Sequence, residues 1–240
     1  MACADVTSAN VCGYNNVGLK AGATAVAPSF VTIGKEGVAL TSIKPTGLPT
    51  GYKGAINIQT LTAYGEKDQM WYYHEGETGR GAKADGWWLE NATQVTPEND
   101  KIFKIGEGLW VTGLNGAKLT SSGEVLTSEL VVELRAGATM IANPFAAGVK
   151  LTSIKPINLP AGYKGAINIQ TLTAYGEKDQ MWYYHEGETG RGAKADGWWL
   201  ENSTQITTDN DVEFAAGAAL WTTGIDGTSL KIPCPYKLSE

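Results

Sequence analysis

Two histidines are the residues with the widest choice of chemistry in this chain. His74 and His185 each lie in the stretch DQMWYYHEGETGRGAKADGWWLEN, which occurs twice, once from Asp68 and once from Asp179. A histidine surrounded by carboxylates could act as a general base or as part of a metal site. However, no serine or cysteine nucleophile stands beside either histidine in a recognisable motif, and no HExxH pattern, calcium loop or second nearby histidine completes a metal site. We therefore expect no catalytic residue, no metal and no cofactor.

Repeated carboxylates leave two further kinds of site open. A glycosidase needs two carboxylates across a cleft, and Asp68 with Glu90 could contribute to a Ca²⁺ site. A repeat unit of about 110 residues is small for a glycosidase cleft. We predict that the protein is not an enzyme, and a small hydrolase using carboxylates near His74 and His185 is the third of three functional hypotheses.

Aromatic side chains in the same stretch could form a binding surface, because their faces stack on sugar rings while neighbouring carboxylates and amides bond the hydroxyls. In a strand, neighbouring residues point to opposite faces, so Trp71 and Tyr73 share one face and Tyr72 takes the other. Trp87 and Trp88 are divided in the same way, and at least one member of each pair is expected in the core. Three roles stay open for these aromatics: core packing, contact with a neighbouring unit or subunit, and glycan stacking. The candidate interaction surface comprises Trp71, Tyr73, Trp87, Trp88, Trp182, Tyr184, Trp198 and Trp199.

The chain is a tandem repeat. Residues 51–91 and 162–202 are identical, at an offset of 111 positions, and the likeness continues on both sides at lower identity. VGLKAGATAVAPSF from Val17 aligns with VELRAGATMIANPF from Val132, and FKIGEGLWVTG from Phe103 aligns with FAAGAALWTTG from Phe214. We divide the chain into residues 1–122, a first β repeat unit with an N-terminal strand segment, and residues 123–240, a second unit with a C-terminal tail.

Each unit is expected to be built of strands. In AINIQTLTAY, from Ala55, Ile56 and Ile58 alternate with Asn57 and Gln59, which is the period of a half-buried strand. Gly-rich stretches and an Asn-Gly pair mark turns, and no segment has sustained helical periodicity. The sequence predicts an all-β protein made of two tandem homologous domains that resemble sandwiches or barrels.

Charge and hydropathy exclude several classes of partner. The formal net charge is -6 and there is no basic run, which argues against nucleic acid. No apolar run is long enough to span a membrane. The start, MACADVTSAN, lacks a complete signal peptide but resembles a chain that begins near a cleavage site, so we expect a secreted protein at the extracellular surface. Sequons begin at Asn91 and Asn202, and they matter only if the source glycosylates secreted chains.

Three cysteines lie near the chain ends and outside the repeated stretch. They are Cys3, Cys12 and Cys234, and none has the CxxC spacing of a zinc or redox motif. Either they are free thiols, with Cys12 packed in a strand, or Cys12 and Cys234 form a disulfide that ties the first strand to the tail, or Cys3 links subunits.

The pieces VCGYNNVGLKAG, AGATMIANPF, a central tryptophan segment and GEGLWV occur in this chain. They resemble the motifs of a β-repeat module of secreted and surface proteins of bacteria. Two motifs depart from the pattern, since APSF replaces ANPF in the first unit and GAALWT replaces GEGLWV in the second. The resemblance implies an exported protein with a structural or adhesive role and no catalytic activity.

Two like β units in one chain also suggest self-assembly. A first unit that contacts its own second unit can contact the second unit of the next molecule, and such a head-to-tail contact builds filaments or sheets. The N-terminal segment ADVTSANVCGYNNVGL could complete the sheet of a neighbour. Our first hypothesis is therefore an extracellular structural protein that assembles into a surface layer or filament. The alternative is a bivalent carbohydrate-binding or adhesive module that uses exposed Trp and Tyr side chains.

Overall fold

The computed structural model describes residues 12–49, 53–62, 66–90, 93–160, 165, 167–172, 177–201 and 204–237. The chain is nearly all β, arranged in small sheets, which confirms the prediction of an all-β protein. The helices of the described residues are two single 3₁₀ turns, η1 (Leu40–Ser42) and η2 (Leu151–Ser153). Within this part of the chain no helix is long and apolar enough to cross a membrane.

Residues 12–124 form three antiparallel sheets, and we call this segment the first half. A three-stranded sheet has the order β1 (Cys12–Gly18), β10 (Lys118–Glu124), β4 (Lys44–Thr46). A five-stranded sheet has the order β2 (Gly22–Val26), β9 (Leu109–Gly113), β5 (Lys53–Leu61), β6 (Lys67–His74), β7 (Gly86–Leu89). The short strands β3 (Val38–Ala39) and β8 (Ile102–Phe103) pair with each other.

Residues 130–232, the second half, repeat this plan strand for strand. The three-stranded sheet is β11 (Leu130–Glu133), β20 (Ser229–Ile232), β14 (Lys155–Ile157). The five-stranded sheet is β12 (Gly137–Ala142), β19 (Ala219–Gly224), β15 (Asn168–Leu172), β16 (Lys178–His185), β17 (Gly197–Leu200). The remaining pair is β13 (Val149–Lys150) with β18 (Glu213–Phe214).

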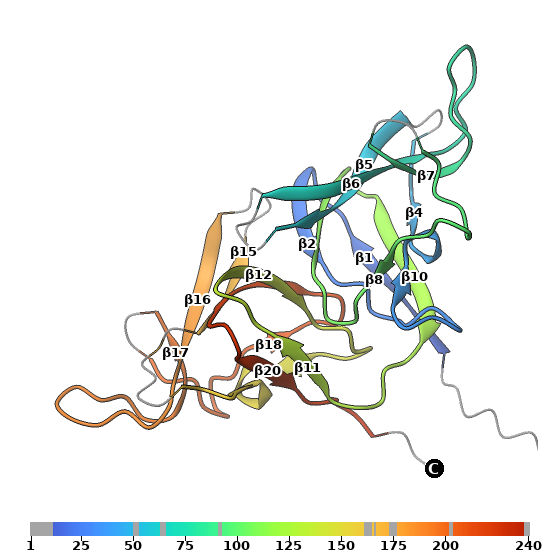
Figure 1. The fold of residues 1–240 in the computed structure, drawn as a ribbon. Coiled ribbons are helices and arrows are strands. Elements are labelled where there is room, and N and C mark those ends of the chain that lie inside the picture. Colours follow the sequence, from blue (N-terminus) through green and yellow to red (C-terminus); the bar gives the residue numbers. More distant parts are fainter. Residues whose placement is uncertain are drawn as a thin grey trace, which may run out of the picture.

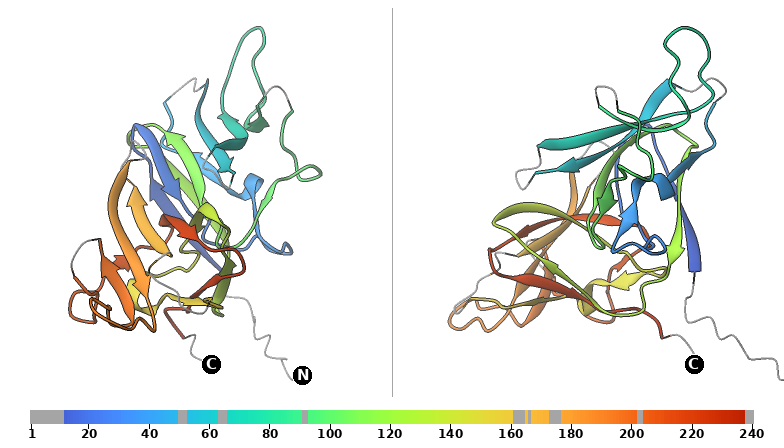
Figure 2. Two further views of the ribbon diagram at one scale, coloured as in Figure 1. Left: turned by 60° about the vertical axis from the view of Figure 1, so that its left-hand side comes forward. Right: turned by 45° about the vertical axis from the view of Figure 1, so that its right-hand side comes forward.

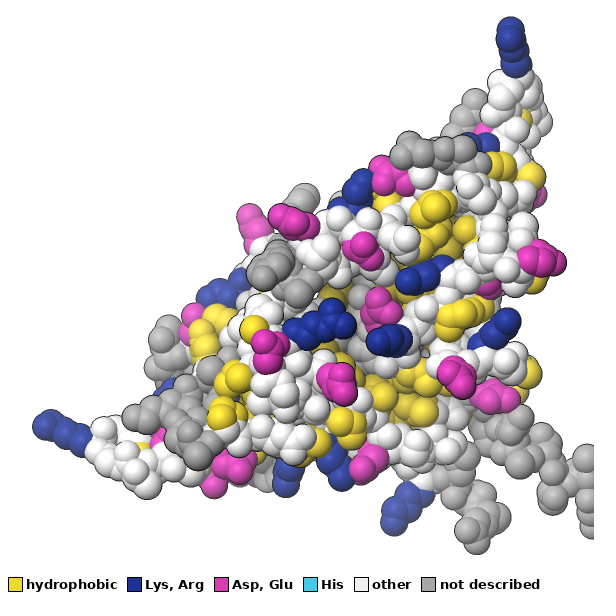
Figure 3. Space-filling model, in the orientation of Figure 1, with side chains coloured by type: hydrophobic (Ala, Val, Ile, Leu, Met, Phe, Trp, Pro, Cys, Tyr) yellow, Lys and Arg dark blue, Asp and Glu magenta, His cyan; other side chains and the backbone are white. Residues whose placement is uncertain are grey.

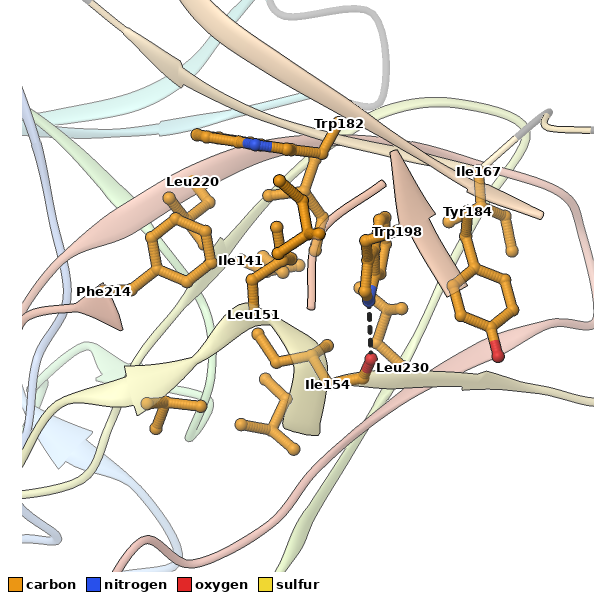
Figure 4. Close-up of a cluster of buried hydrophobic side chains, with 14 of the residues drawn as sticks. Ile141, Leu151, Ile154, Ile167, Trp182, Tyr184, Trp198, Phe214, Leu220 and Leu230 are labelled. Atoms are coloured by element: carbon orange, nitrogen blue, oxygen red, sulfur yellow. Dashed lines mark hydrogen bonds between the residues drawn. The ribbon is translucent and has the colours of Figure 1, made fainter. Parts of the chain in front are cut away.

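Each half has its own hydrophobic core, because the buried cluster of each draws on side chains from that half and from no other described residues. Figure 4 shows the second core, where Trp182, Phe214 and Leu220 lie together and the indole of Trp198 points toward η2. The indole nitrogen of Trp198 donates a 2.7 Å hydrogen bond to the carbonyl oxygen of Ile154. Trp87 makes the same 2.7 Å bond to Ile43 in the first core. A buried indole N–H therefore finds an acceptor in both cores, as burial of a donor requires.

The two halves meet through backbone pairing that is reciprocal, and we call this contact the junction. At one side, the amide of Ala27 donates to the carbonyl of Gly217 at 2.8 Å. At the other, the amide of Ala142 donates to the carbonyl of Gly106 at 2.9 Å. These positions correspond in the repeat alignment, so each half gives the same backbone groups to the other. Figures 1 and 2 show the consequence: the first half (blue to green) and the second half (olive to red) lie side by side with their longest loops at opposite ends.

Of two predictions about the chain ends, the addition of the N-terminal segment to a neighbour's sheet stays a prediction and the disulfide is wrong. Residues 12–18 of the N-terminal segment already pair with β10 of their own half, so these residues are not free on that side to complete the sheet of a neighbour. Cys12, exposed at the start of β1, and Cys234, half-buried, are free thiols, so the alternative of a disulfide between them is wrong. The thiol of Cys234 lies 3.2 Å from the carbonyl oxygen of Tyr236 instead. Cys3 lies outside the described residues.

Candidate functional site

The repeated aromatic stretch forms the hairpin β6–β7, with Tyr72 opposite Trp88 and Tyr73 opposite Trp87. Trp71 and Trp87 point inward and are 3% and 2% exposed. Both lie in the first core, where Tyr73 packs beside them with its ring 5.1 Å from that of Trp87. The prediction that these rings belong to an exposed interaction surface is therefore wrong for Trp71 and Trp87, because the core takes them.

The second hairpin, β16–β17, distributes its aromatics in the same way. Trp182, Trp198 and Tyr184 are 1%, 2% and 7% exposed, so they too belong to a core and not to a contact surface. Of the eight aromatics predicted as a surface, Trp88 and Trp199 are half-buried on the opposite side of the sheet.

The opposite side of the five-stranded sheet carries a half-exposed set of aromatic rings and amides, which we call the outer aromatic face. In the first half, the strand registers place Asn57 opposite both Tyr72 and Thr112, and place Gln59 opposite Trp110. Because neighbouring strands lie about 4.8 Å apart, the face extends over roughly 14 Å from β9 to β7. Its members are Asn57, Gln59, Tyr72, Trp88 and Trp110, all of intermediate exposure.

Several polar groups on this face are available to a ligand. Within the described residues, the amides of Asn57 and Gln59, the hydroxyl of Tyr72 and the indole nitrogen of Trp110 form no side-chain hydrogen bond with the protein. None of these atoms is among the fully buried polar atoms that lack a partner, so water reaches them. Donors and acceptors thus stand between half-exposed rings, an arrangement that fits a ligand with apolar faces and many hydroxyl groups.

The second half repeats the outer aromatic face. Asn168 lies opposite Tyr183 and Thr223, and Gln170 lies opposite Trp221, by the registers of the equivalent strands. The second face comprises Asn168, which is 9% exposed, and four residues of intermediate exposure: Gln170, Tyr183, Trp199 and Trp221. Both faces lie mostly within the identical residues 51–91 and 162–202, and the two tryptophans outside this block, Trp110 and Trp221, also match.

The loop between β6 and β7 fixes one ring of the outer aromatic face. This Gly-rich loop projects from the body of the protein (Figure 1). The ammonium of Lys83 lies 5.0 Å from the ring centroid of Trp88, and the indole nitrogen of Trp88 donates to the carbonyl of Ala84 at 2.9 Å. Lys194 and Trp199 make the same cation–π contact at 5.1 Å in the second half. The loop therefore holds the ring in one orientation.

The two histidines are buried at the base of these loops. His74 is 9% exposed, and its Nδ1 lies 2.6 Å from Oε1 of Glu77, whose other oxygen accepts the amide of Lys83 at 3.1 Å. Nε2 of His74 is buried without a hydrogen-bond partner, because the ring packs on Gly54, where an added Cβ would lie 2.9 Å from Cε1. His185 and Glu188 repeat this geometry. A histidine whose second nitrogen is enclosed cannot reach a substrate atom, and the pair instead anchors the loop to the sheet.

Other carboxylates of the stretch serve local structure. Asp85, which the sequence places near His74, accepts the amide of Gly76 at 2.7 Å. Burial and the neighbouring carboxylate of Glu75 raise the pKa of Tyr73 above its ordinary value. Asp68 accepts the hydroxyl of Thr60 at 3.0 Å. In the described part of the chain, no three His, Cys, Asp or Glu side chains come together as a metal site would require. Asn91 and Asn202 lie outside the described residues.

Sequence reasoning missed Trp110 and Trp221 as members of the outer aromatic faces. Both stand in segments, GEGLWV and GAALWT, that contributed to the resemblance and not to the predicted interaction surface. The available signal was their alternation with Leu109 and Val111 in the first half, whose burial turns Trp110 to the other side of the sheet.

Comparison of the chain with protein-family models, with curated proteins and with solved structures finds no match.

Proposed function

We propose that this protein is a bivalent carbohydrate-binding module that uses its two outer aromatic faces. The observation that supports the proposal most directly is the pairing of half-exposed rings with unbonded amide and hydroxyl groups on the same side of one sheet. Sugar rings offer C–H groups that lie flat on aromatic faces and hydroxyls that bond amides, so the two kinds of group on this face match the two kinds on a glycan.

The domain division belongs to the same proposal. Residues 1–122 and 123–240 would be two homologous domains of sandwich-like or barrel-like form, each presenting one face. Two weak identical sites on one chain gain avidity when they bind the same polymer. A face of roughly 14 Å is longer than one sugar ring, so an oligosaccharide or polysaccharide is the expected ligand. The expected setting stays extracellular, since such polymers coat cell surfaces.

The geometry favours this function over assembly into filaments or layers. The head-to-tail hypothesis required a contact between first and second halves that is left open to the next molecule. Here the junction is satisfied within one chain, and its reciprocal pattern has the form of a two-fold contact, which closes and does not propagate. The same backbone groups are therefore not available for a polymer contact.

The proposal is tested by depletion of the protein from solution with a panel of insoluble polysaccharides. Trp110→Ala combined with Trp221→Ala should abolish retention, and either change alone should weaken it strongly because avidity is lost. Tyr14→Ala is the matched control, since Tyr14 is an aromatic on β1 that is 72% exposed and lies outside both faces. Retention that survives the double change, or an absence of retention across the panel, would refute the proposal.

A further inference from the structure

A cleft of about 560 Å³ lies at the junction, and we call it the junction cleft. Its walls come from both halves: the end of β5, the connection from β8 to β9, and strands β11 and β12. This volume is within the range of pockets that hold small molecules. Figure 3 shows this side of the protein, where Lys and Arg side chains and Asp and Glu side chains gather near the middle of the view.

Three cations and three carboxylates line the junction cleft without pairing with one another. The cations are Lys101, Lys104 and Arg135, and the carboxylates are Asp68, Glu107 and Glu133. Among the described residues, none of these six side chains takes part in a salt bridge. Charges that share one cleft and do not neutralise each other are available to a ligand.

Some of these groups are already held in place. Lys101 is half-buried, with its ammonium 5.9 Å from the ring centroid of Trp71. The carboxylate of Glu107 accepts the backbone amide of Lys104 at 3.0 Å, which anchors the acidic side chain at the edge of the cleft. Because these cationic and anionic side chains are already held in place, they lose little conformational freedom when a ligand binds.

The repeat supplies a comparison that no single cleft could offer. A second cleft of about 290 Å³ lies on the other side of the junction and is lined by equivalent strands. In the repeat alignment Val212 and Ala215 are the counterparts of Lys101 and Lys104, and Ala218 is the counterpart of Glu107. Ala215 and Ala218 line the smaller cleft. Among the described residues, the charged side chains of its lining are Lys20, the counterpart of Arg135, and Glu213. The larger volume and the added charges therefore occur together in one cleft of an otherwise duplicated chain.

We propose that the junction cleft binds a sugar acid, that is, a small polyhydroxylated carboxylate such as a uronate. The cations would hold the carboxylate, and Arg135 has the planar fork that suits it. The carboxylates of the cleft would accept the ligand's hydroxyls, and Val132 and Met140 would pack on its apolar ring face. A mixed lining of this kind fits a ligand that carries one anionic group and several hydroxyl donors. This site is separate from the outer aromatic faces.

The experiment uses the full chain and measures binding by equilibrium dialysis with three probes: glucuronate, glucose and glutamate. Glucuronate should bind, more weakly as salt rises, and glucose should bind at least about tenfold more weakly because it lacks the carboxylate. The double variant Lys101→Val with Lys104→Ala should lose at least about tenfold in glucuronate affinity. The second half carries those same residues in the same fold, so the variant is expected to fold, and circular dichroism checks this.

Lys20→Ala is the matched control, because it removes a cation from the smaller cleft, and it should leave glucuronate binding unchanged. Glucuronate binding should also persist when Trp110 and Trp221 are replaced, which separates this proposal from the glycan proposal. The inference is overturned if glucuronate fails to bind, if glucose binds equally well, or if the double variant keeps full affinity. Preferential binding of glutamate would also overturn it, since the site would then select a zwitterion and not a sugar acid.

Discussion

Asn143 is expected to stabilise the second half more than any other single polar side chain near the junction. It is 3% exposed and follows β12, and its amide nitrogen lies 3.0 Å from the carbonyl oxygens of Ala147, Phe214 and Ala215. Its side-chain oxygen accepts the buried amide of Phe145 at 3.1 Å. One side chain thus connects the turn after β12 with the end of β18 and the residue that follows it.

Asn143→Ala removes two N–H donors and one acceptor at once. With each net hydrogen bond contributing about 1 kcal/mol, the free energy of unfolding of the second half should fall by about 3 kcal/mol. About one third of that loss comes from the Phe145 amide, which is left buried without its acceptor. Guanidinium denaturation followed by far-ultraviolet circular dichroism measures this fall in the free energy of unfolding. Two transitions in the curve would show that the two halves unfold separately.

The first half provides a control for this experiment. At the equivalent turn Pro28 replaces the asparagine, and the neighbouring Ser29 hydroxyl makes longer bonds, donating to the Ala27 carbonyl at 3.3 Å and accepting from the Asn15 amide at 3.4 Å. Ser29→Ala should therefore cost less than about 1 kcal/mol. If Asn143→Ala costs no more than Ser29→Ala, the assignment of the turn's stability to the asparagine amide is refuted.

Three further predictions concern the junction, a tyrosine and a thiol. Gly108→Ala should destabilise the protein by about 1–3 kcal/mol in thermal unfolding, because the new Cβ would lie 2.4 Å from Cγ of Met140, and an unchanged midpoint would contradict the close contact. Glu75→Gln should lower the pKa of Tyr73 in ultraviolet titration, since burial and the Glu75 carboxylate raise it. A raised folded-state pKa means that this tyrosine's contribution to stability is complete below its ordinary value of about 10 and is lost as pH rises beyond it, so the opposite trend would count against the contact. Cys12 should react with a thiol reagent in the native protein, and peptide mapping that finds it protected would argue against its exposure as a free thiol.

The strands of this fold were predictable because burial on one face imposes a two-residue period. Ile56 and Ile58 alternate with Asn57 and Gln59 along β5, and the hydrophobic pair is fully buried in the structure. The junction was not predictable in the same way. It depends on backbone donors and acceptors, such as the Ala27 amide, which carry no side-chain signature.

The candidate site was half predictable. Strand alternation separates Tyr72 from Trp71 and Trp88 from Trp87, but it does not say which member of each pair faces solvent. That choice depends on the pairing of β5 with β9, which brings Trp110 to the same side as Tyr72. Register between distant strands is a property of the assembled sheet, so the membership of the outer aromatic faces had to come from the structure.

In the vocabulary of quaternary structure, the reciprocal junction makes this chain the equivalent of a two-fold dimer whose subunits have been joined end to end. In a dimer of separate identical chains, every substitution near the axis appears twice, so a lysine gained in one cleft would be gained in both. Joining the subunits removes that constraint. Lys101 can then have a valine, Val212, as its counterpart, and one chain can keep its two outer surfaces alike while its two axial clefts diverge in charge and size.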